Sequence, residues 1–290
     1  MKSHYVPSSY LRRFTDERGR LWVFDKATGK AFWSSPRNIA KEEGFYRRQD
    51  ERDLAGLVES PVGPVLRKVS NREAIDLRER LLLAVFMAVQ LTRVPRFRDD
   101  AWRHLPEVMS ATFAKWIHRI RRSGESSGET AEAAEQVREL ERVWEEYAAS
   151  PPQDVVDFVR SPWPTRRRIA MFWNMPWCFA CTTGANYYVS TDNPVFLFES
   201  YGLGSPKSEI SFPISKSVAL MGSKRLRAVD CSYVDVPDSI VREVNARLVS
   251  TATRFVFYYR SVSWISKIAA KPDRGLSHID WLLVRRRPDL

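Results

Sequence analysis

The first residues of the chain that could carry out chemistry cluster at its amino terminus. His4 is one of four histidines, and imidazole is the side chain whose unperturbed pKa lies closest to neutral pH, so His4 is a candidate catalytic acid or base. A short helix after Pro7 is expected to place a phenol and two guanidinium groups beside it, as candidate substrate-binding groups. These are Tyr10, Arg12 and Arg13. The alternative is a terminal helix that only docks through Leu11 and Phe14.

A second polar cluster follows a predicted strand late in the chain. It reads Ser190-Thr191-Asp192-Asn193-Pro194. Asp192 could orient His4 or bind a metal, and Asn193 would supply an amide to the same catalytic site. The hydroxyls of Ser190 and Thr191 would bind substrate. Asp and Asn also bond their own backbone in tight turns, so a plain turn between two strands is the alternative. The catalytic interpretation requires His4 and Asp192 to lie within about 10 Å of each other.

The three cysteines do not predict a metal site or a disulfide framework. Cys178 and Cys181 have the spacing of a metal or redox pair, but a structural zinc site needs four ligands and Cys231 is the one other thiol. Cysteines buried in a strand are the simpler interpretation, and no metal is predicted. Gly-rich phosphate loops, Walker lysines, HExxH and nucleophile-elbow motifs are absent from the sequence, so any cofactor stays unknown.

The net charge indicates a class of partner. The chain carries 46 basic and 35 acidic residues, a formal charge of +11, and the guanidinium of arginine binds phosphate as a fork. Nucleic acid is therefore a candidate partner, with exposed tryptophans as stacking platforms for its bases. The arginine clusters that could bind it include Arg119, Arg121 and Arg122, and Arg166, Arg167 and Arg168. An equally weighted alternative is that the net charge serves only to keep the protein soluble.

No segment predicts secretion or membrane insertion. The amino terminus lacks the pattern of a signal peptide, and the longest apolar run, Leu81 to Val89, is about half of the roughly 20 residues that a spanning helix needs. An odd number of cysteines fits a reducing compartment. We therefore expect a soluble, cytoplasmic protein with no membrane partner, and the sequence leaves the oligomeric state unknown.

The elements that must position these residues are those of an α+β fold in a single domain, residues 1–290. An N-terminal hairpin is expected to pair 21–25 with 30–33 around a Gly-containing turn. A helical subregion over about 51–173 follows. Its main helices are predicted at 51–69, bent by Pro61 and Pro64, at 72–92 with Asn71 as N-cap, at 99–122 and at 131–147.

A strand-rich subregion over about 177–260 is expected to form a mostly antiparallel sheet with a packed helix over 237–252. Asp192 follows one of its strands, a position from which many folds project functional groups. The strands are predicted at 177–182, 187–190, 195–198, 209–212, 218–221, 231–236 and 254–259.

Several blocks of the sequence resemble a known family. They are His4-Tyr5-Val6-Pro7 with Tyr10-Leu11-Arg12-Arg13-Phe14, Leu21-Trp22-Val23-Phe24-Asp25-Lys26, Gly44-Phe45-Tyr46, Thr191-Asp192-Asn193-Pro194 and Phe212-Pro213-Ile214-Ser215. Their order and spacing, across most of the chain, are similar to the bacterial family called domain of unknown function 4238. The resemblance implies no activity. Its members more often read Thr-Ser before Asp-Asn-Pro, an exchange of hydroxyls that leaves Asp192 and Asn193 in place.

Three functional hypotheses follow, in order of preference. The first is a nucleic-acid-binding protein, whose catalytic form would be a nuclease-like effector with His4 as acid or base and Arg12 or Arg13 holding a phosphate. The second is a non-catalytic protein-interaction or structural module, in which the two clusters tie the amino terminus to the strand region. The third is a small-molecule enzyme. The nuclease-like form of the first hypothesis depends on His4 and Asp192 meeting in space.

Overall fold

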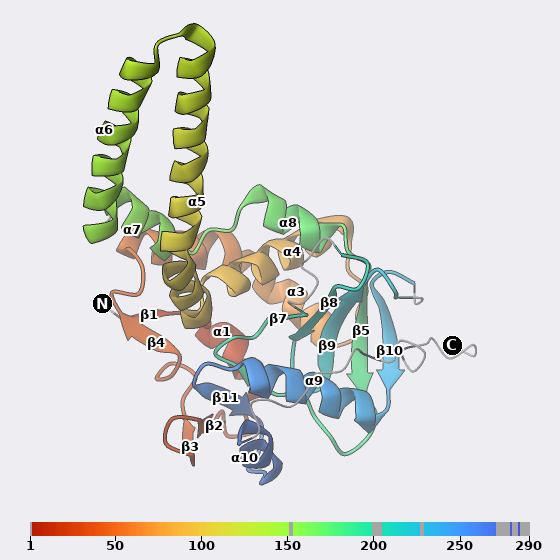
Figure 1. Ribbon diagram of the computed structural model, residues 1–290. Helices are drawn as coiled ribbons and strands as arrows, with labels where there is room; N and C mark the ends of the chain where they lie inside the picture. The colour runs from red at the N-terminus through yellow and green to blue at the C-terminus, as the bar shows by residue number, and fades with distance from the viewer. Residues whose placement is uncertain are drawn as a thin grey trace. The chain divides into compact units, whose positions relative to one another are not determined.

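The computed structural model describes residues 2–150, 153–198, 205–226 and 229–270, together with residues 279 and 284. The chain divides into two compact units. The first joins Met1–Pro95 to Pro162–Leu290, and the second is Arg96–Ser161. The boundaries of the second unit fall inside the helical subregion expected over about 51–173. Both units are drawn in Figure 1.

The amino-terminal elements of the first unit are short. In chain order they are β1 (Lys2–His4), α1 (Ser8–Leu11), a 3-10 turn (Arg12–Phe14), β2 (Leu21–Asp25), β3 (Lys30–Ser34) and β4 (Lys41–Glu43). The predicted hairpin of β2 and β3 is confirmed. Its turn ends on Gly29 at φ +67°, a left-handed conformation that glycine adopts without steric cost. β1 pairs antiparallel with β4, which places His4 opposite Lys41.

The helical part of the first unit is nearly continuous in its first half. Its elements are α2 (Arg48–Asp53), a π-helical segment (Leu54–Glu59), α3 (Ser60–Ser70), α4 (Leu77–Thr92) and α8 (Arg166–Trp173). The irregularity expected from Pro61 and Pro64 takes the form of the π-helical segment that ends just before Ser60. Proline lacks the N–H that the i→i−4 ladder needs, so the hydrogen bonding must change near these residues.

The helix expected over 72–92 begins later than predicted, and Asn71 is not its N-cap. Asp76 is the N-cap of α4: its carboxylate accepts the Glu79 N–H at 2.8 Å, and the Glu79 carboxylate accepts the Asp76 N–H at 3.0 Å. This reciprocal capping box satisfies two donors at the helix start. Arg72 adopts φ +61°, which right-handed helix geometry excludes, and Asn71 instead ends α3.

A five-stranded sheet forms the centre of the first unit. Its strands are β5 (Trp177–Thr182), β7 (Phe196–Leu197), β8 (Glu209–Pro213), β9 (Val218–Ser223) and β10 (Ser232–Val236), in the order β10-β5-β9-β8-β7. Only the β10–β5 pair is parallel. The apolar side of α9 (Asp238–Thr251) packs on one face, while α3, α4 and α8 contribute to the core on the other face. The α+β fold with a mostly antiparallel sheet and a packed helix is confirmed.

A second sheet, of four strands, joins the N-terminal hairpin to two later strands of the chain. It adds β11 (Phe255–Tyr258) and β6 (Ser190–Thr191) to the N-terminal hairpin, in the order β3-β2-β11-β6, with every pair antiparallel. α10 (Trp264–Ala269) supplies Ile265 to the apolar cluster on one face of this sheet. The hairpin predicted from local sequence is thus one edge of a sheet completed by strands more than 150 residues away.

The second unit is a long helical hairpin. It consists of α5, which starts at Pro95 and ends at Ser127, α6 (Thr130–Ala149) and α7 (Gln153–Arg160). Phe113 on α5 packs on Trp144 of α6 with 4.8 Å between ring centroids. Near the tip the helices approach so closely that a Cβ on Gly124 would lie 2.4 Å from the Cβ of Ala133.

The helices of the described ranges do not include one that is long and apolar enough to cross a membrane. α5 and α6 have sufficient length, but charged side chains interrupt both of them.

Candidate functional site

The two polar clusters of the sequence meet at Tyr10. α1 carries this tyrosine into the core, where its side chain is fully buried and its ring stacks on Phe212 with 5.5 Å between centroids. Its hydroxyl donates to the carbonyl of Pro213 at 2.7 Å and lies 2.9 Å from Oγ of Ser190. Burial raises the pKa of Tyr10, so the phenol stays neutral. Tyr10 and Ser190, both predicted to bind substrate, contact each other inside the core.

His4 lies half-buried at the end of β1. Its Nε2 lies 3.2 Å from the carbonyl of Arg37, which also accepts a hydrogen bond from Nζ of Lys41 at 3.0 Å. Burial lowers the pKa of His4 below its usual 6.5, which favours the neutral imidazole. A neutral imidazole has the protonation state of a general base. The contact of the His4 ring, however, is with the backbone carbonyl of Arg37.

A buried polar cluster beside His4 was missed by the sequence analysis. Arg93, just after α4, donates to the backbone carbonyl of His4 and to the Tyr46 hydroxyl at 2.7 Å, and its Nη1 lies 2.7 Å from a Glu59 carboxylate oxygen. The Tyr46 hydroxyl also donates to the His4 carbonyl. The side chain of Arg93 is fully buried. The block Gly44-Phe45-Tyr46 was a signal for this cluster, whereas nothing local to Arg93 indicated that it would be buried. The cluster anchors β1 to α4.

Asp192 is buried and bound by backbone amides. Its carboxylate accepts N–H groups from Thr253 at 2.9 Å, Arg254 at 2.6 Å and Phe255 at 2.8 Å. Burial raises the pKa of Asp192 to about 6, against the opposite effect of these three hydrogen bonds. Both carboxylate oxygens are used to hold the connection between α9 and β11.

The remaining residues of the second cluster form a turn. The Thr191 hydroxyl donates to the carbonyl of Asn193 at 2.8 Å and accepts the Asn193 N–H at 3.1 Å. The side-chain amide of Asn193 donates to the Thr251 carbonyl at 3.4 Å. In the described part of the chain, no hydrogen bond or ion pair joins His4 to Asp192 or Asn193. Catalysis by these three residues stays a prediction, and each of them has structural partners instead.

The two arginines after Tyr10 differ in their surroundings. Arg13 donates to Oγ of Ser70 at 3.2 Å and to the carbonyl of Gly63 at 3.1 Å, so it holds the 3-10 turn against α3. Arg12 is exposed, and among the described residues its guanidinium has no hydrogen-bond or ion-pair partner. Of the pair, Arg12 is the one presented to solvent.

The cysteines lie in the core rather than in a metal site. Cys178 and Cys181 are buried and free, three residues apart on β5, and their side chains join the apolar clusters on opposite faces of the sheet. Burial raises the pKa of both thiols. Among the described residues, no group of three or more His, Cys, Asp or Glu side chains could hold a metal ion. The interpretation of Cys178 and Cys181 as buried residues of a strand is confirmed.

The surface feature with the chemistry of a binding site is an aromatic row on the four-stranded sheet. Trp33 pairs in register with Trp22, which pairs with Tyr258, so the three side chains share one face of β3, β2 and β11. The rings of Trp22 and Tyr258 stack with 6.4 Å between centroids and 21° between planes. Tyr258 is buried, Trp22 is half-buried, and Trp33 on the edge strand is 61% exposed. We call these three residues the aromatic row.

Arginines lie at the same end of the sheet as the aromatic row. Arg20 immediately precedes β2, while Arg37 and Arg260 follow β3 and β11, and antiparallel pairing brings these three positions to one end of the sheet. Arg20 is paired with Asp16 at 2.8 Å. Arg37 and Arg260 are exposed, and no described carboxylate pairs with either of them. Sequence reasoning found the hairpin but not its pairing with β11, which assembles this end.

The positive charge of the protein is concentrated in the first unit. That unit carries 36 basic and 22 acidic residues, whereas the second carries 10 and 13. The sheet that holds the aromatic row therefore belongs to a unit of formal charge +14. Arg166 and Arg167 on α8, named as a cluster from the sequence, are exposed in the same unit.

The chain is an α+β protein in which a five-stranded and a four-stranded sheet share one unit and the family motifs are built into its core. The chain belongs to the family described as Protein of unknown function (DUF4238), whose model matches residues 2–261. This confirms the resemblance found in the sequence blocks. No curated protein and no solved structure matches the chain.

Proposed function

We propose that the protein is a nucleic-acid-binding module that takes single-stranded RNA or DNA on the end of its four-stranded sheet. The observation that carries the proposal is Trp33, an exposed indole on an edge strand, in register with Trp22 and Tyr258 and close to Arg37 and Arg260. An indole face stacks on an unpaired base, and guanidinium groups bind the adjoining phosphates.

A single strand fits this site better than a duplex does. In a duplex the bases already stack on each other, and their faces are not available to an indole on a sheet edge. A single strand can place one base on Trp33 while its backbone follows the arginines. The excess positive charge of the first unit would attract either form, so it supports affinity but not the choice between them.

We propose a module that binds nucleic acid without cleaving it, rather than the nuclease-like effector expected from the sequence. Three contacts support this choice: Tyr10 with Ser190, Asp192 with the amides after α9, and His4 with the Arg37 carbonyl. Each of these contacts stabilises the fold, and none of them leaves a carboxylate or hydroxyl directed at an open site.

The proposal is tested by fluorescence anisotropy with a labelled oligouridylate and with its duplex. We expect wild type to prefer the single strand, with affinity that falls as salt rises. Trp33→Ala should weaken binding by about 5- to 150-fold, the equivalent of the roughly 1–3 kcal/mol that stacking on one base contributes.

Phe32→Ala is the matched control. Phe32 neighbours Trp33 on β3, is 39% exposed and points to the opposite face of the sheet. Its replacement should leave affinity within about twofold of wild type, since it removes no stacking surface from the aromatic row. Equal losses in both variants, or equal affinity of wild type for single strand and duplex, would exclude the proposed site.

A further inference from the structure

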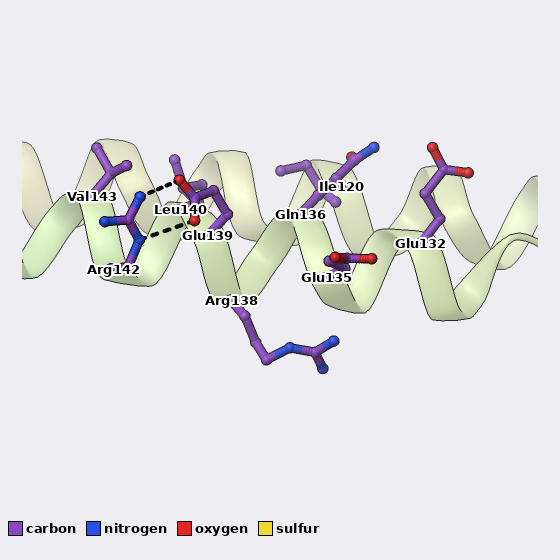
Figure 2. A pocket seen from close by; sticks show the side chains of 9 residues that line it. All are labelled: Ile120, Glu132, Glu135, Gln136, Arg138, Glu139, Leu140, Arg142 and Val143. Atoms are coloured by element: carbon purple, nitrogen blue, oxygen red, sulfur yellow. Dashed lines mark hydrogen bonds and ion pairs between the residues drawn. The ribbon is translucent and has the colours of Figure 1, made fainter.

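The helical hairpin of the second unit has an open groove along one side. Ile120 of α5 lies at its floor, with Leu140 and Val143 of α6 beside it, and all three are half-buried (Figure 2). Trp116 lies one turn before Ile120 on the same side of α5 and is 47% exposed. A two-helix hairpin covers only the inner stripe of each helix, so this apolar stripe lies open in the described hairpin.

The two helices that border the groove carry opposite charge. α5 has seven basic and four acidic residues, whereas α6 has two basic and six acidic residues. Arg119 is exposed on the α5 side, and Glu132 and Glu135 are exposed on the α6 side. None of these three side chains has an ion pair among the described residues. Arg142, by contrast, is already paired with Glu139 at 2.6 Å (Figure 2) and with Glu146 at 2.7 Å.

We propose that this groove is a dimer interface, and that its occupant is the same face of a second copy of the chain. In the dimer, α5 of each copy lies on α6 of the other, and the four helices form an antiparallel bundle. The apolar stripes of Trp116, Ile120, Leu140 and Val143 cover each other at the centre of the bundle.

Charge complementarity selects this arrangement of the two copies. A two-fold axis that places α5 on α5 and α6 on α6 would bring like charges together, which costs several kcal/mol at an interface. The axis that places α5 on α6 of the partner instead pairs Arg119 with Glu132 and Glu135, and it does so twice because a two-fold interface repeats every contact.

The test is sedimentation equilibrium of the full chain over a concentration series. We expect wild type to form a dimer. A first variant, Glu132→Lys with Glu135→Lys, makes both borders of the groove basic, and a second, Arg119→Glu, makes both borders acidic. Each variant alone should dimerise at least about tenfold more weakly than wild type. An equimolar mixture of the two should form a heterodimer, because both of its interfaces regain opposite charge.

Glu141→Lys with Glu145→Lys is the matched control, with the same change of charge on the side of α6 away from this groove. It should dimerise as wild type does, and circular dichroism of each variant checks that the helices are intact. A monomeric wild type overturns the proposal. The proposal is also overturned if the charge variants dimerise as strongly as the control, or if the control dimerises as weakly as they do. A mixture of the two folded charge variants that stays monomeric would overturn it as well.

Discussion

The hydroxyl of Tyr10 lies 2.9 Å from Oγ of Ser190, a residue 180 positions further along the chain. Through this pair the amino-terminal helix is fixed to the strand that precedes Asp192. The same hydroxyl donates to the carbonyl of Pro213, so three sequence blocks converge on one buried atom. The blocks therefore help to hold the amino-terminal helix of the first unit against its later strands.

Tyr10→Phe should therefore destabilise the protein without changing its volume. The variant leaves the buried carbonyl of Pro213 and the Ser190 hydroxyl without their partner, at an expected cost of about 1–3 kcal/mol in the free energy of unfolding. Urea denaturation measures the change. Tyr259→Phe is the control, since its hydroxyl bonds the exposed Glu17 at 3.3 Å and its loss should cost at most about 0.5 kcal/mol. Equal stability of the two variants contradicts the proposed role of Tyr10.

Gln90→Met should stabilise the protein. Gln90 on α4 is fully buried, and neither its amide nitrogen nor its carbonyl oxygen has a hydrogen-bond partner among the described residues. Methionine is unbranched and of similar volume, so the substitution removes an uncompensated polar group at an expected gain of about 1–3 kcal/mol. Thermal melting gives the sign directly. A lower melting temperature would mean that the amide has a partner, such as a bound water.

His4 should make the protein less stable as the pH falls. Burial lowers its folded-state pKa below the 6.5 of the unfolded chain, so acidification protonates the unfolded state first. Its contribution is constant above about pH 6.5 and is lost progressively below that value. His4→Gln keeps a donor for the Arg37 carbonyl but does not titrate. We expect the stability difference between wild type and variant to change between pH 7 and 5, and a constant difference over that range would contradict the assignment.

The local sequence predicted the helices and strands more fully than it predicted which of them pair or pack with each other. The alternation in β2 and β3, the amphipathic pattern of α6 and most of the strands from Trp177 onward depend on neighbouring residues, and these are confirmed. The strand predicted over 187–190 is the exception, because the observed strand there, β6, covers Ser190–Thr191. The start of α4 was also readable, because Asp76 and Glu79 have the spacing of a capping box. Asn71 also has a side chain suited to an N-cap, but it ends α3 instead.

Long-range relationships could not be predicted in this way. The pairing of β2 with β11 and the contact of Tyr10 with Ser190 join residues far apart in sequence, and no local periodicity specifies them. The burial of Arg93 depends on Glu59, Tyr46 and the His4 carbonyl, which reach it from three other elements. The aromatic row has the same origin, since Trp33 becomes part of it only when β11 pairs with β2.

Stacking of a base on Trp33 is tested most directly by photo-crosslinking. The protein is bound to an oligonucleotide that carries 4-thiouridine, irradiated and digested with trypsin, and the modified peptides are mapped by mass spectrometry. If a base stacks on Trp33, the peptide 31–37, which contains Trp33, is the main crosslinked product and excess unlabelled single strand suppresses it. Crosslinks confined to other peptides, such as those around Arg166 and Arg167, would show that the base binds elsewhere.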